Sequence, residues 1–384
     1  MKKARTAYLL LSVLALMSIL AAACAPTTPE ALPTEAATTA PATDVPAPTD
    51  APTDVPEPTE AAATEAPTEA MEEIGSEAHP IKVLFVPSVD ANVITTGGDI
   101  MAEALNEATG LVFEVSVPTS YAATIEEMCA SPEDTMAFIP AQGYVLANGL
   151  CGVDVSFKAV RRGWGVYWTE FIVRRDSGIE SLEDLEGKSW AYPDAGSTSG
   201  YLAPLVFMNE NGIEFGEQVE AGGHPQVVNA VVNGEADFGT TFFSPYAVPE
   251  GETPWDIGDE PDVPEDVLES CAPNADGLFC GDYRVLDARA NVREEVPDIV
   301  QQVKILALTE PIPNDTLSFA PDFPAELRTQ IEEALLEFAE TDAWAESIGN
   351  EDFYGWSGVE PATDAEYDVI RLMVEEAGIT LEDL

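Results

Sequence analysis

Three small hydroxyl-bearing residues, Ser197, Thr198 and Ser199, follow one another in the chain and are succeeded by a glycine. They lie between a strand-like run at 189–192 and an amphipathic run at 202–208. At the start of a helix, free backbone N–H groups, hydroxyl donors and the positive end of the helix dipole meet at one point. We therefore expect this turn to capture a tetrahedral anion, although an isolated Ser-Thr-Ser could also be a plain helix N-cap.

A hydrolytic enzyme is a second hypothesis for the same residues. Ser197, His224 and Asp237 are the residue types of a nucleophilic triad. The chain has no Gly-x-Ser-x-Gly elbow, and such residue types meet by chance in any chain of this length. We therefore expect no enzymatic activity.

Apart from Cys24, the chain has four cysteines, Cys129, Cys151, Cys271 and Cys280. An even number in an exported domain predicts two disulfides, with three possible pairings. The spacing favours Cys129–Cys151 and Cys271–Cys280, because the members of each pair share a local region. A metal site is the alternative, but no Cys-x-x-Cys spacing occurs and there are only two histidines. We expect neither a metal nor a cofactor.

The elements that must position these residues alternate between strand and helix patterns. Alternation at this spacing predicts an α/β fold with a largely parallel sheet. The folded part from His79 onward is long enough for two lobes of about 100–200 residues each. The predicted elements are strand 81–86, helix 98–109, strand 111–117, helix 121–130, strand 135–139, helix 143–148, and strands 155–160 and 167–174.

Several motifs together resemble a known family. The segment Ser-Leu-Glu-Asp-Leu-Glu-Gly-Lys at 181–188 is similar to one found in type 2 periplasmic binding proteins just after the chain enters the second lobe. Four further motifs, at 197–201, 222–224, 230–239 and 311–315, resemble in order and spacing the phosphate/phosphite/phosphonate-binding components of ABC importers.

This resemblance implies a two-lobed Venus-flytrap fold, in which hinge-linked lobes each contain a mixed, mostly parallel sheet. Residues 79–175 and 312–384 would form lobe 1, and residues 176–311 would form lobe 2. The ligand would be clamped in the cleft, and a partner permease would sense the hinge closure. We expect a monomer that captures phosphate, phosphite or an alkylphosphonate.

The resemblance also implies a ligand-binding set of hydroxyls, one histidine and one carboxylate. Its members are Ser197, Thr198, Ser199, His224, Tyr121, Tyr144 and Asp315. A carboxylate repels an oxyanion unless a proton lies between them, so Asp315 could select a ligand with a P–OH group or bind an ammonium group. The alternatives are an Asn-Asp turn at 314–315, a structural histidine and core tyrosines.

One departure from the family bears on the ligand. Aminoalkylphosphonate binders place a second acidic residue soon after the Ala-Asp-Phe-Gly-like motif. Here the segment 240–245 contains no acidic residue, and the next one is Glu250. This favours phosphate, phosphite or methylphosphonate over 2-aminoethylphosphonate. The same fold could instead bind a sulfonate, a carboxylate or a pyrimidine, or present its ligand to a sensor. Trp168, preceded by Arg161 and Arg162, could form a wall of the cleft.

The N-terminus predicts export. Basic residues precede an apolar core at 7–23, which is the pattern of a signal peptide, here assigned to residues 1–23. Leu-Ala-Ala-Ala-Cys at 20–24 resembles a lipobox, which implies cleavage before Cys24 and lipidation of its thiol. An ordinary cleavage site with a chance cysteine is the alternative. The expected location is extracytoplasmic, anchored to the cell membrane.

Residues 24–78 predict a disordered tether. They consist mainly of Ala, Pro, Thr, Glu and Asp, a composition that cannot bury a core and favours extended polyproline segments. The formal net charge of the chain is −54. Such a charge excludes nucleic acid as a partner and limits membrane contact to the lipid anchor. An anion site must therefore rely on local donors.

Overall fold

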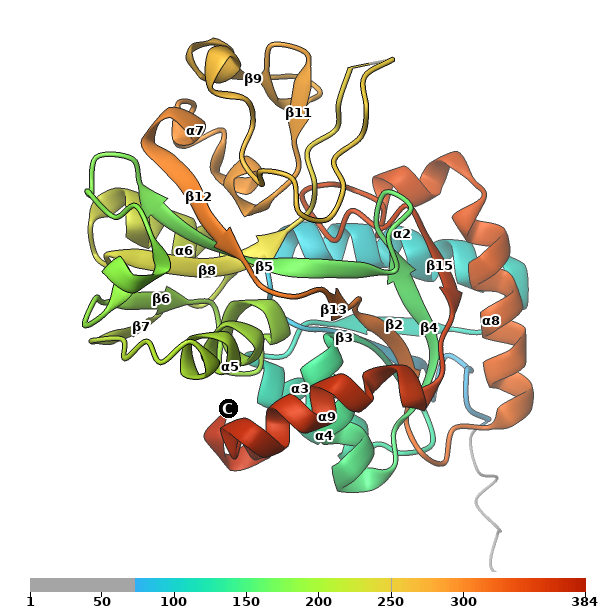
Figure 1. The fold of residues 1–384 in the computed structure, drawn as a ribbon. Helices are drawn as coiled ribbons and strands as arrows, with labels where there is room; N and C mark the ends of the chain where they lie inside the picture. Colours follow the sequence, from blue (N-terminus) through green and yellow to red (C-terminus); the bar gives the residue numbers. More distant parts are fainter. Residues whose placement is uncertain (1–72, 250) are drawn as a thin grey trace, which may run out of the picture. The chain divides into compact units, whose positions relative to one another are not determined.

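Two mixed β-sheets, each covered by helices, form the framework of the computed structural model, which describes residues 73–249 and 251–384 (Figure 1). The first sheet has the strand order β15-β4-β14-β3-β1-β2. Its strands are β1 (Ile81–Phe85), β2 (Phe113–Ser116), β3 (Thr135–Ile139), β4 (Asp154–Val160), β14 (Thr316–Phe319) and β15 (Gly358–Pro361).

The second sheet has the order β12-β5-β8-β6-β7, with β13 also paired to β5. Its strands are β5 (Val166–Arg174), β6 (Trp190–Tyr192), β7 (Gln218–Glu220), β8 (Phe238–Phe243), β12 (Val303–Leu308) and β13 (Ile312–Pro313). We call the first sheet with its helices the first lobe, and the second sheet with its helices the second lobe.

Eight α-helices occur in the described part of the chain. They are α2 (Ala91–Thr109), α3 (Tyr121–Ala130), α4 (Ala141–Cys151), α5 (Ala203–Glu210), α6 (His224–Asn233), α7 (Ile299–Gln302), α8 (Ala325–Ala339) and α9 (Asp368–Ala377). The alternation of side chains along β1 explains why helices are needed on both faces of the first sheet. Ile81, Val83 and Phe85 pack with residues of α2 and α8, whereas Leu84 packs with residues of α3 and α4.

Helix α2 is longer than the sequence predicted. It begins after Asp90, whose side chain accepts a hydrogen bond from Asn92 N, and it ends at Gly110 in the left-handed conformation. Gly97 and Gly98 lie inside this helix. A Cβ at Gly97 would lie 2.6 Å from the Phe353 side chain, and a Cβ at Gly98 would lie 2.8 Å from the Val115 side chain. The glycines thus permit close packing and do not start the helix.

The sheets are mixed, but parallel pairs are not the majority. Parallel pairing joins β1 to β2 and β3 in the first lobe, and β6 to β7 and β8 in the second. The pairs that involve β4, β5, β12 or β14 are antiparallel. These strands carry the chain into and out of the lobes, so they do not follow the strand–helix–strand pattern that makes neighbours parallel.

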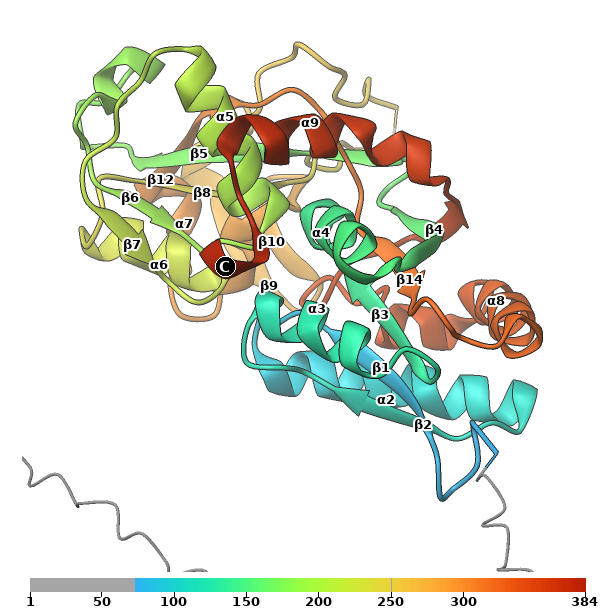
Figure 2. The same ribbon diagram turned by 90° about the horizontal axis from the view of Figure 1, so that it is seen from below.

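The chain first crosses between the lobes earlier than expected. The nine-residue strand β5 pairs with β8 and β12 of the second sheet, so the crossing lies at 161–165 and not after residue 175. The return crossing precedes β14, near the predicted position 312. Helix α9 contacts both α4 of the first lobe and α5 of the second (Figure 2).

A small antiparallel sheet is inserted in the second lobe and lies at the top of Figure 1. Its strands are β9 (Cys271–Asn274), β10 (Gly277–Cys280) and β11 (Tyr283–Val285). A disulfide joins the opposed Cys271 and Cys280, and a second disulfide, Cys129–Cys151, joins α3 to the end of α4. Both bonds have the pairing that the spacing favoured.

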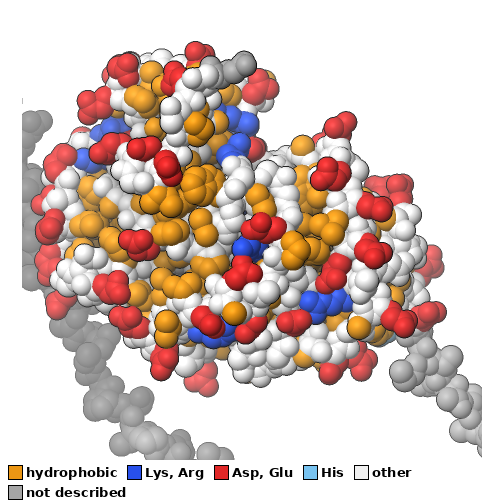
Figure 3. All heavy atoms as spheres, turned by 45° about the vertical axis from the view of Figure 1, so that its right-hand side comes forward, with side chains coloured by type: hydrophobic (Ala, Val, Ile, Leu, Met, Phe, Trp, Pro, Cys, Tyr) orange, Lys and Arg blue, Asp and Glu red, His pale blue; other side chains and the backbone are white. Residues whose placement is uncertain are grey.

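The folded domain starts before His79. Gly75 accepts a backbone hydrogen bond from Val112, and Ile74 packs on the core of the first lobe. The predicted signal peptide, Cys24 and most of the tether lie outside the described residues. Within the described part, no helix is both long and apolar enough to cross a bilayer. Acidic side chains are spread over the surface, with few lysines and arginines among them (Figure 3).

Candidate functional site

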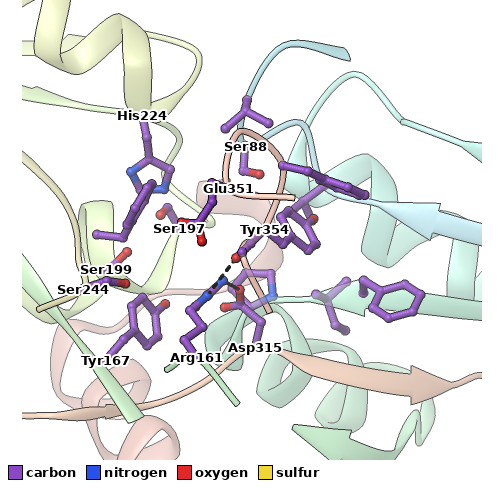
Figure 4. Close-up of a pocket in the computed structure, with 18 of the residues that line it drawn as sticks. Ser88, Arg161, Tyr167, Ser197, Ser199, His224, Ser244, Asp315, Glu351 and Tyr354 are labelled. Atoms are coloured by element: carbon purple, nitrogen blue, oxygen red, sulfur yellow. Dashed lines mark hydrogen bonds and ion pairs between the residues drawn. The ribbon is translucent and has the colours of Figure 1, made fainter. Parts of the chain in front are cut away.

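A cavity of about 60 Å³ lies between the two lobes (Figure 4). A water molecule needs about 10–15 Å³ on the same measure, so the cavity suits a ligand of a few heavy atoms. Its polar lining is drawn from both lobes and from both crossings. The polar and charged residues that line it are Ser88, Tyr121, Arg161, Arg162, Tyr167, Ser197, Ser199, His224, Ser244, Asp315, Glu351 and Tyr354.

The Ser-Thr-Ser turn opens a helix beside this cavity. Ser197 is the N-cap, and its Oγ accepts a hydrogen bond of 3.1 Å from Gly200 N. One π-helical turn, Thr198–Leu202, then leads directly into α5. The N-cap role and a ligand role are compatible, because a hydroxyl that accepts one hydrogen bond still has a proton to donate. Ser197 and Ser199 both line the cavity.

Thr198 holds the lobes together and does not line the cavity. Its Oγ1 accepts a hydrogen bond of 2.8 Å from Gln142 N at the start of α4 in the first lobe. The side chain of Gln142 in turn donates to Ala195 O at 3.0 Å. Thr198 therefore bonds across the cleft, and the predicted contact with a ligand has no support in this geometry.

His224 begins α6 and lines the cavity, as expected from the sequence. Its backbone N donates to Ser88 O of the first lobe at 3.2 Å. Burial, with a smaller effect from the positive Arg161, lowers the pKa of the imidazole to about 3. The ring is therefore neutral at pH 7 and offers one donor and one acceptor nitrogen.

Three buried polar atoms at the cavity have no hydrogen-bond partner of acceptable geometry among the described residues. They are Ser88 Oγ, His224 Nδ1 and Tyr354 OH, and the Ser88 and Tyr354 hydroxyls are near neighbours of each other. An unpaired buried polar group costs about 1–3 kcal/mol, so proteins rarely retain one without a reason. Since these three converge on one cavity from both lobes, they indicate a polar ligand that would complete their hydrogen bonds (Figure 4).

Asp315 lines the cavity where the chain returns to the first lobe, and it forms an ion pair with Arg161 on the outward crossing. Arg161 Nη2 lies 2.7 Å from Asp315 Oδ2. The guanidinium also donates to Asn314 Oδ1 at 3.3 Å and to Tyr354 O at 3.1 Å. It lies 5.2 Å from the centroid of the Tyr167 ring. The two crossings are thus joined through one arginine.

The two predicted tyrosines have different positions. Tyr121 lines the cavity, and its Cβ would lie 2.5 Å from a Cβ placed at Gly196, so a glycine allows the lobes to meet here. Tyr144 does not line the cavity. Its hydroxyl donates to Asp364 Oδ1 at 2.6 Å, and its ring packs edge-on against Tyr367. Tyr144 therefore anchors the C-terminal segment.

Sequence reasoning missed several cavity residues. Arg161 was noted only as a neighbour of Trp168, which itself packs against other tryptophans and does not line the cavity. The available signal was a pair of arginines directly after a long strand, in a chain with only 16 lysines and arginines. Nothing local marked the remaining missed members, Ser88, Tyr167, Ser244, Glu351 and Tyr354.

The charges at the cavity occur in pairs. Arg161 is paired with Asp315, and Arg162 with Glu351. Burial raises the pKa of the Tyr121, Tyr167 and Tyr354 phenols above their ordinary value, and Asp315 raises each of them further. These hydroxyls therefore remain protonated, and the site consists of neutral donors around balanced charges.

No group of three or more His, Cys, Asp or Glu side chains within the described ranges could hold a metal ion. What the cavity can do is bind an oxyanion through hydroxyl, imidazole and guanidinium hydrogen bonds.

The chain has several relatives among known proteins. The phosphate-import protein PhnD of Mycolicibacterium smegmatis is 27% identical over 314 residues, which cover 78% of this chain and 86% of that protein. A binding-protein component of an ABC phosphonate transporter from Pseudomonas aeruginosa has a TM-score of 0.58 at 17% identity, covering 77% of this chain and 85% of its own. PhnD1 from Prochlorococcus marinus, solved in complex with methylphosphonate, has a TM-score of 0.58 at 14% identity, and the match covers 78% of this chain and 98% of that chain.

The two structural relatives share the fold. The model of the family described as ABC transporter, phosphonate, periplasmic substrate-binding protein matches residues 83–367. This family consists of transport components that lie outside the cytoplasm. A match over this length shows that the chain belongs to the family of periplasmic substrate-binding proteins of phosphonate ABC transporters.

Proposed function

We propose that this protein captures a small phosphorus oxyanion, namely phosphate, phosphite or an alkylphosphonate, and presents it to the permease subunits of an ABC importer. The observation that carries the proposal is the convergence of three unpaired buried atoms, Ser88 Oγ, His224 Nδ1 and Tyr354 OH, on one cavity. The hydroxyls of Ser197 and Ser199 at a helix start add donors of the kind that oxyanions need. The protein binds and delivers, and it performs no catalysis.

The ligand contacts we propose follow from these positions. Ser197, Ser199 and His224 would bind from the second lobe, and Tyr121 would bind from the first lobe. Asp315 would act at the crossing, next to Arg161. Of the predicted ligand residues, Thr198 and Tyr144 are left out because neither lines the cavity.

A small anion without an amine fits best. The cavity volume of about 60 Å³ favours a ligand the size of phosphate or methylphosphonate. A second carboxylate, Glu351, does line the cavity, although it comes from a segment far from 240–245. Since Arg162 already forms an ion pair with Glu351, the charge of this carboxylate is offset, which weakens its attraction for the ammonium group of 2-aminoethylphosphonate.

A phosphorus oxyanion is favoured over a sulfonate, a carboxylate or a pyrimidine. The Gly-Gly-His motif and the Pro-Ile-Pro-Asn-Asp motif, which those other classes commonly lack, both bring a side chain to the cavity. These side chains are His224 and Asp315. The names of the Mycolicibacterium and Prochlorococcus relatives support the same ligand class.

Delivery requires the lobes to open. The bonds from Gln142 N to Thr198 Oγ1 and from His224 N to Ser88 O join opposite lobes and must break when the cavity opens. Closure would then be the state that the permease recognises. We further propose that a signal peptide at 1–23 is removed, that Cys24 is lipidated, and that the protein is a tethered monomer outside the cytoplasm.

A ligand panel tests the proposal. The thermal unfolding of the purified protein is measured with phosphate, phosphite, methylphosphonate, 2-aminoethylphosphonate, an alkylsulfonate and a dicarboxylate. A ligand that binds only the folded state adds about 2.7 kcal/mol at a hundredfold excess over its dissociation constant. We expect an increase in Tm with at least one of the phosphorus anions that lack an amine. An increase only with the sulfonate or the dicarboxylate would overturn the ligand class.

A further inference from the structure

The ion pair between Arg161 and Asp315 bears on the ionisation state of the ligand. A lone carboxylate in a cavity repels an oxyanion, and it accepts one only when a proton lies between the two. Here the carboxylate is not alone, because Arg161 Nη2 lies 2.7 Å from Asp315 Oδ2 and both side chains are largely buried. A pair of this kind has no net charge, so it neither repels a dianion nor requires a protonated ligand.

The position of Arg161 is held firmly. Its Nε donates to Tyr354 O, Nη1 donates to Asn314 Oδ1, and Nη2 donates to Asp315. An arginine has five N–H groups, and the remaining two have no acceptor among the described residues. Since the residue lines the cavity, an oxyanion bound there would accept from these N–H groups without any loss of the bond to Asp315.

Apart from Arg162 and Glu351, which form an ion pair with each other, the other polar lining groups are neutral. Ser88, Ser197, Ser199 and Tyr354 are hydroxyls, and the buried His224 is neutral, with a pKa lowered to about 3. A dianion needs only donors, whereas a ligand with a P–OH group also needs an acceptor. Of the carboxylate oxygens of Asp315, only Oδ1 is not engaged by Arg161 and could serve as that acceptor.

We propose that Arg161 determines the charge of the ligand: by offsetting Asp315, it makes the cavity select the doubly ionised oxyanion over the singly protonated form. This inference rests on the proposed function, because it concerns the ionisation of the phosphorus ligand in the same cavity. It replaces the role in which Asp315 shares a proton with the ligand.

Other titratable groups surround the pair and must be considered in any pH experiment. The phenols of Tyr121, Tyr167, Tyr354 and Tyr367 are near Asp315, and their pKa values are raised by burial and further by Asp315. Near Tyr121 is Asp194, whose pKa is raised by burial and which accepts a hydrogen bond from Gly196 N. The remaining charged groups at the cavity are Arg162 and Glu351, which pair with each other.

The test measures the dissociation constants of methylphosphonate and phosphite by calorimetry between pH 5.5 and pH 9. We expect binding to weaken tenfold for each pH unit below the second ionisation of the ligand and to be constant above it. Because phosphite loses its second proton at a lower pH than methylphosphonate, the break must move with the ligand. This shift separates ionisation of the ligand from titration of Asp194.

Substitutions then assign the effect. In Arg161→Gln, Asp315 is uncompensated, so we expect weaker binding above the break and a reversed slope, with the protonated ligand preferred. Asp315→Asn added to Arg161→Gln should restore the original slope. The matched control is Arg328→Gln, which removes an arginine paired with Glu332 and Asp154 away from the cavity, and it should not alter the slope.

The outcomes separate the two proposals. If the parent protein binds the phosphorus anions more tightly as the pH falls below the break, Asp315 does share a proton with the ligand, and only this inference is overturned. The same holds if Arg161→Gln keeps the parent slope. If neither methylphosphonate, phosphite nor phosphate binds at any pH, the proposed function itself fails.

Discussion

Arg293 and Asp352 form a two-point ion pair between the lobes, outside the ligand cavity. Nη1 of Arg293 lies 2.5 Å from Oδ1 of Asp352, and Nη2 lies 2.8 Å from Oδ2. Arg293 follows the short helix at 288–292, which packs on α6 of the second lobe, whereas Asp352 precedes β15 of the first lobe. Its neighbour Glu351 lines the cavity. The pair therefore holds the second lobe against a segment that forms part of the binding site.

Removal of this ion pair should weaken ligand binding without touching the ligand. Asp352→Asn favours the open form, and each 1.4 kcal/mol lost from the closed form weakens binding about tenfold. Since the pair is partly exposed, we expect a loss of about three- to tenfold, measured by calorimetry at low salt. The exposed Asp322→Asn is the control. The charge-exchanged double variant, Arg293→Asp with Asp352→Arg, should bind more tightly than either of these two single variants. A loss of affinity equal to the sum of the losses in Arg293→Asp and in Asp352→Arg would contradict the role of the pair.

Loss of a cavity donor should weaken binding of the phosphorus oxyanion. Ser199→Ala and His224→Ala each remove a group that lines the cavity, so each should weaken binding by about tenfold or more. Equilibrium dialysis of labelled phosphate or calorimetry with methylphosphonate measures the change. If both variants bind like the parent protein, the assignment of the site is wrong.

Tyr144→Phe should leave ligand affinity unchanged. The hydroxyl of Tyr144 donates to Asp364, which also pairs with Arg371 on α9. Its removal should lower the free energy of unfolding by about 1 kcal/mol, because one hydrogen bond of a carboxylate is lost. Urea unfolding and calorimetry on the same sample separate the two effects. A tenfold loss of affinity with unchanged stability would restore Tyr144 to the binding site.

The ligand-free protein should lose stability in acid partly through His224. The pKa of this buried imidazole is lowered to about 3 in the folded state, whereas an unfolded histidine titrates near 6.5. Between these values the unfolded chain binds the extra proton, so the free energy of unfolding falls as the pH decreases below about 6.5. From pH 6.5 to pH 5 the expected contribution is about 2 kcal/mol.

His224→Gln removes that titration, so urea unfolding at pH 5, 6.5 and 8 should show a shallower acid loss than in the parent protein. The matched comparison is Asn229→Gln on the same helix, a half-buried amide that bonds to Glu295 and does not titrate. Equal pH dependence in the parent and His224→Gln would show that the imidazole is not held neutral by burial.

Much of the fold could be predicted from the sequence alone, because local patterns set it. The periods of apolar residues placed α3 and β3 at their observed positions, since each pattern lies within a single element. The Ser-Thr-Ser turn and the Gly-Gly-His start of α6 were also recognisable, because helix starts depend on adjacent residues. The predicted lobe limits were less accurate, because the sequence of an apolar strand such as β5 does not show which of the two sheets the strand joins.

The composition of the site was decided by tertiary structure. Arg161 and Asp315 lie 154 positions apart, and they meet only because the two crossings of the chain run side by side. Ser88 and Tyr354 carry no local signal and become ligand candidates only when closure of the lobes leaves them buried without partners. Conversely, Thr198 and Tyr144 had suitable chemistry, but their hydroxyls found acceptors or donors elsewhere in the fold. The sequence by itself indicated many of the elements, the favoured disulfide partners and the family resemblance, whereas packing of the two lobes decided which polar atoms remain free for a ligand.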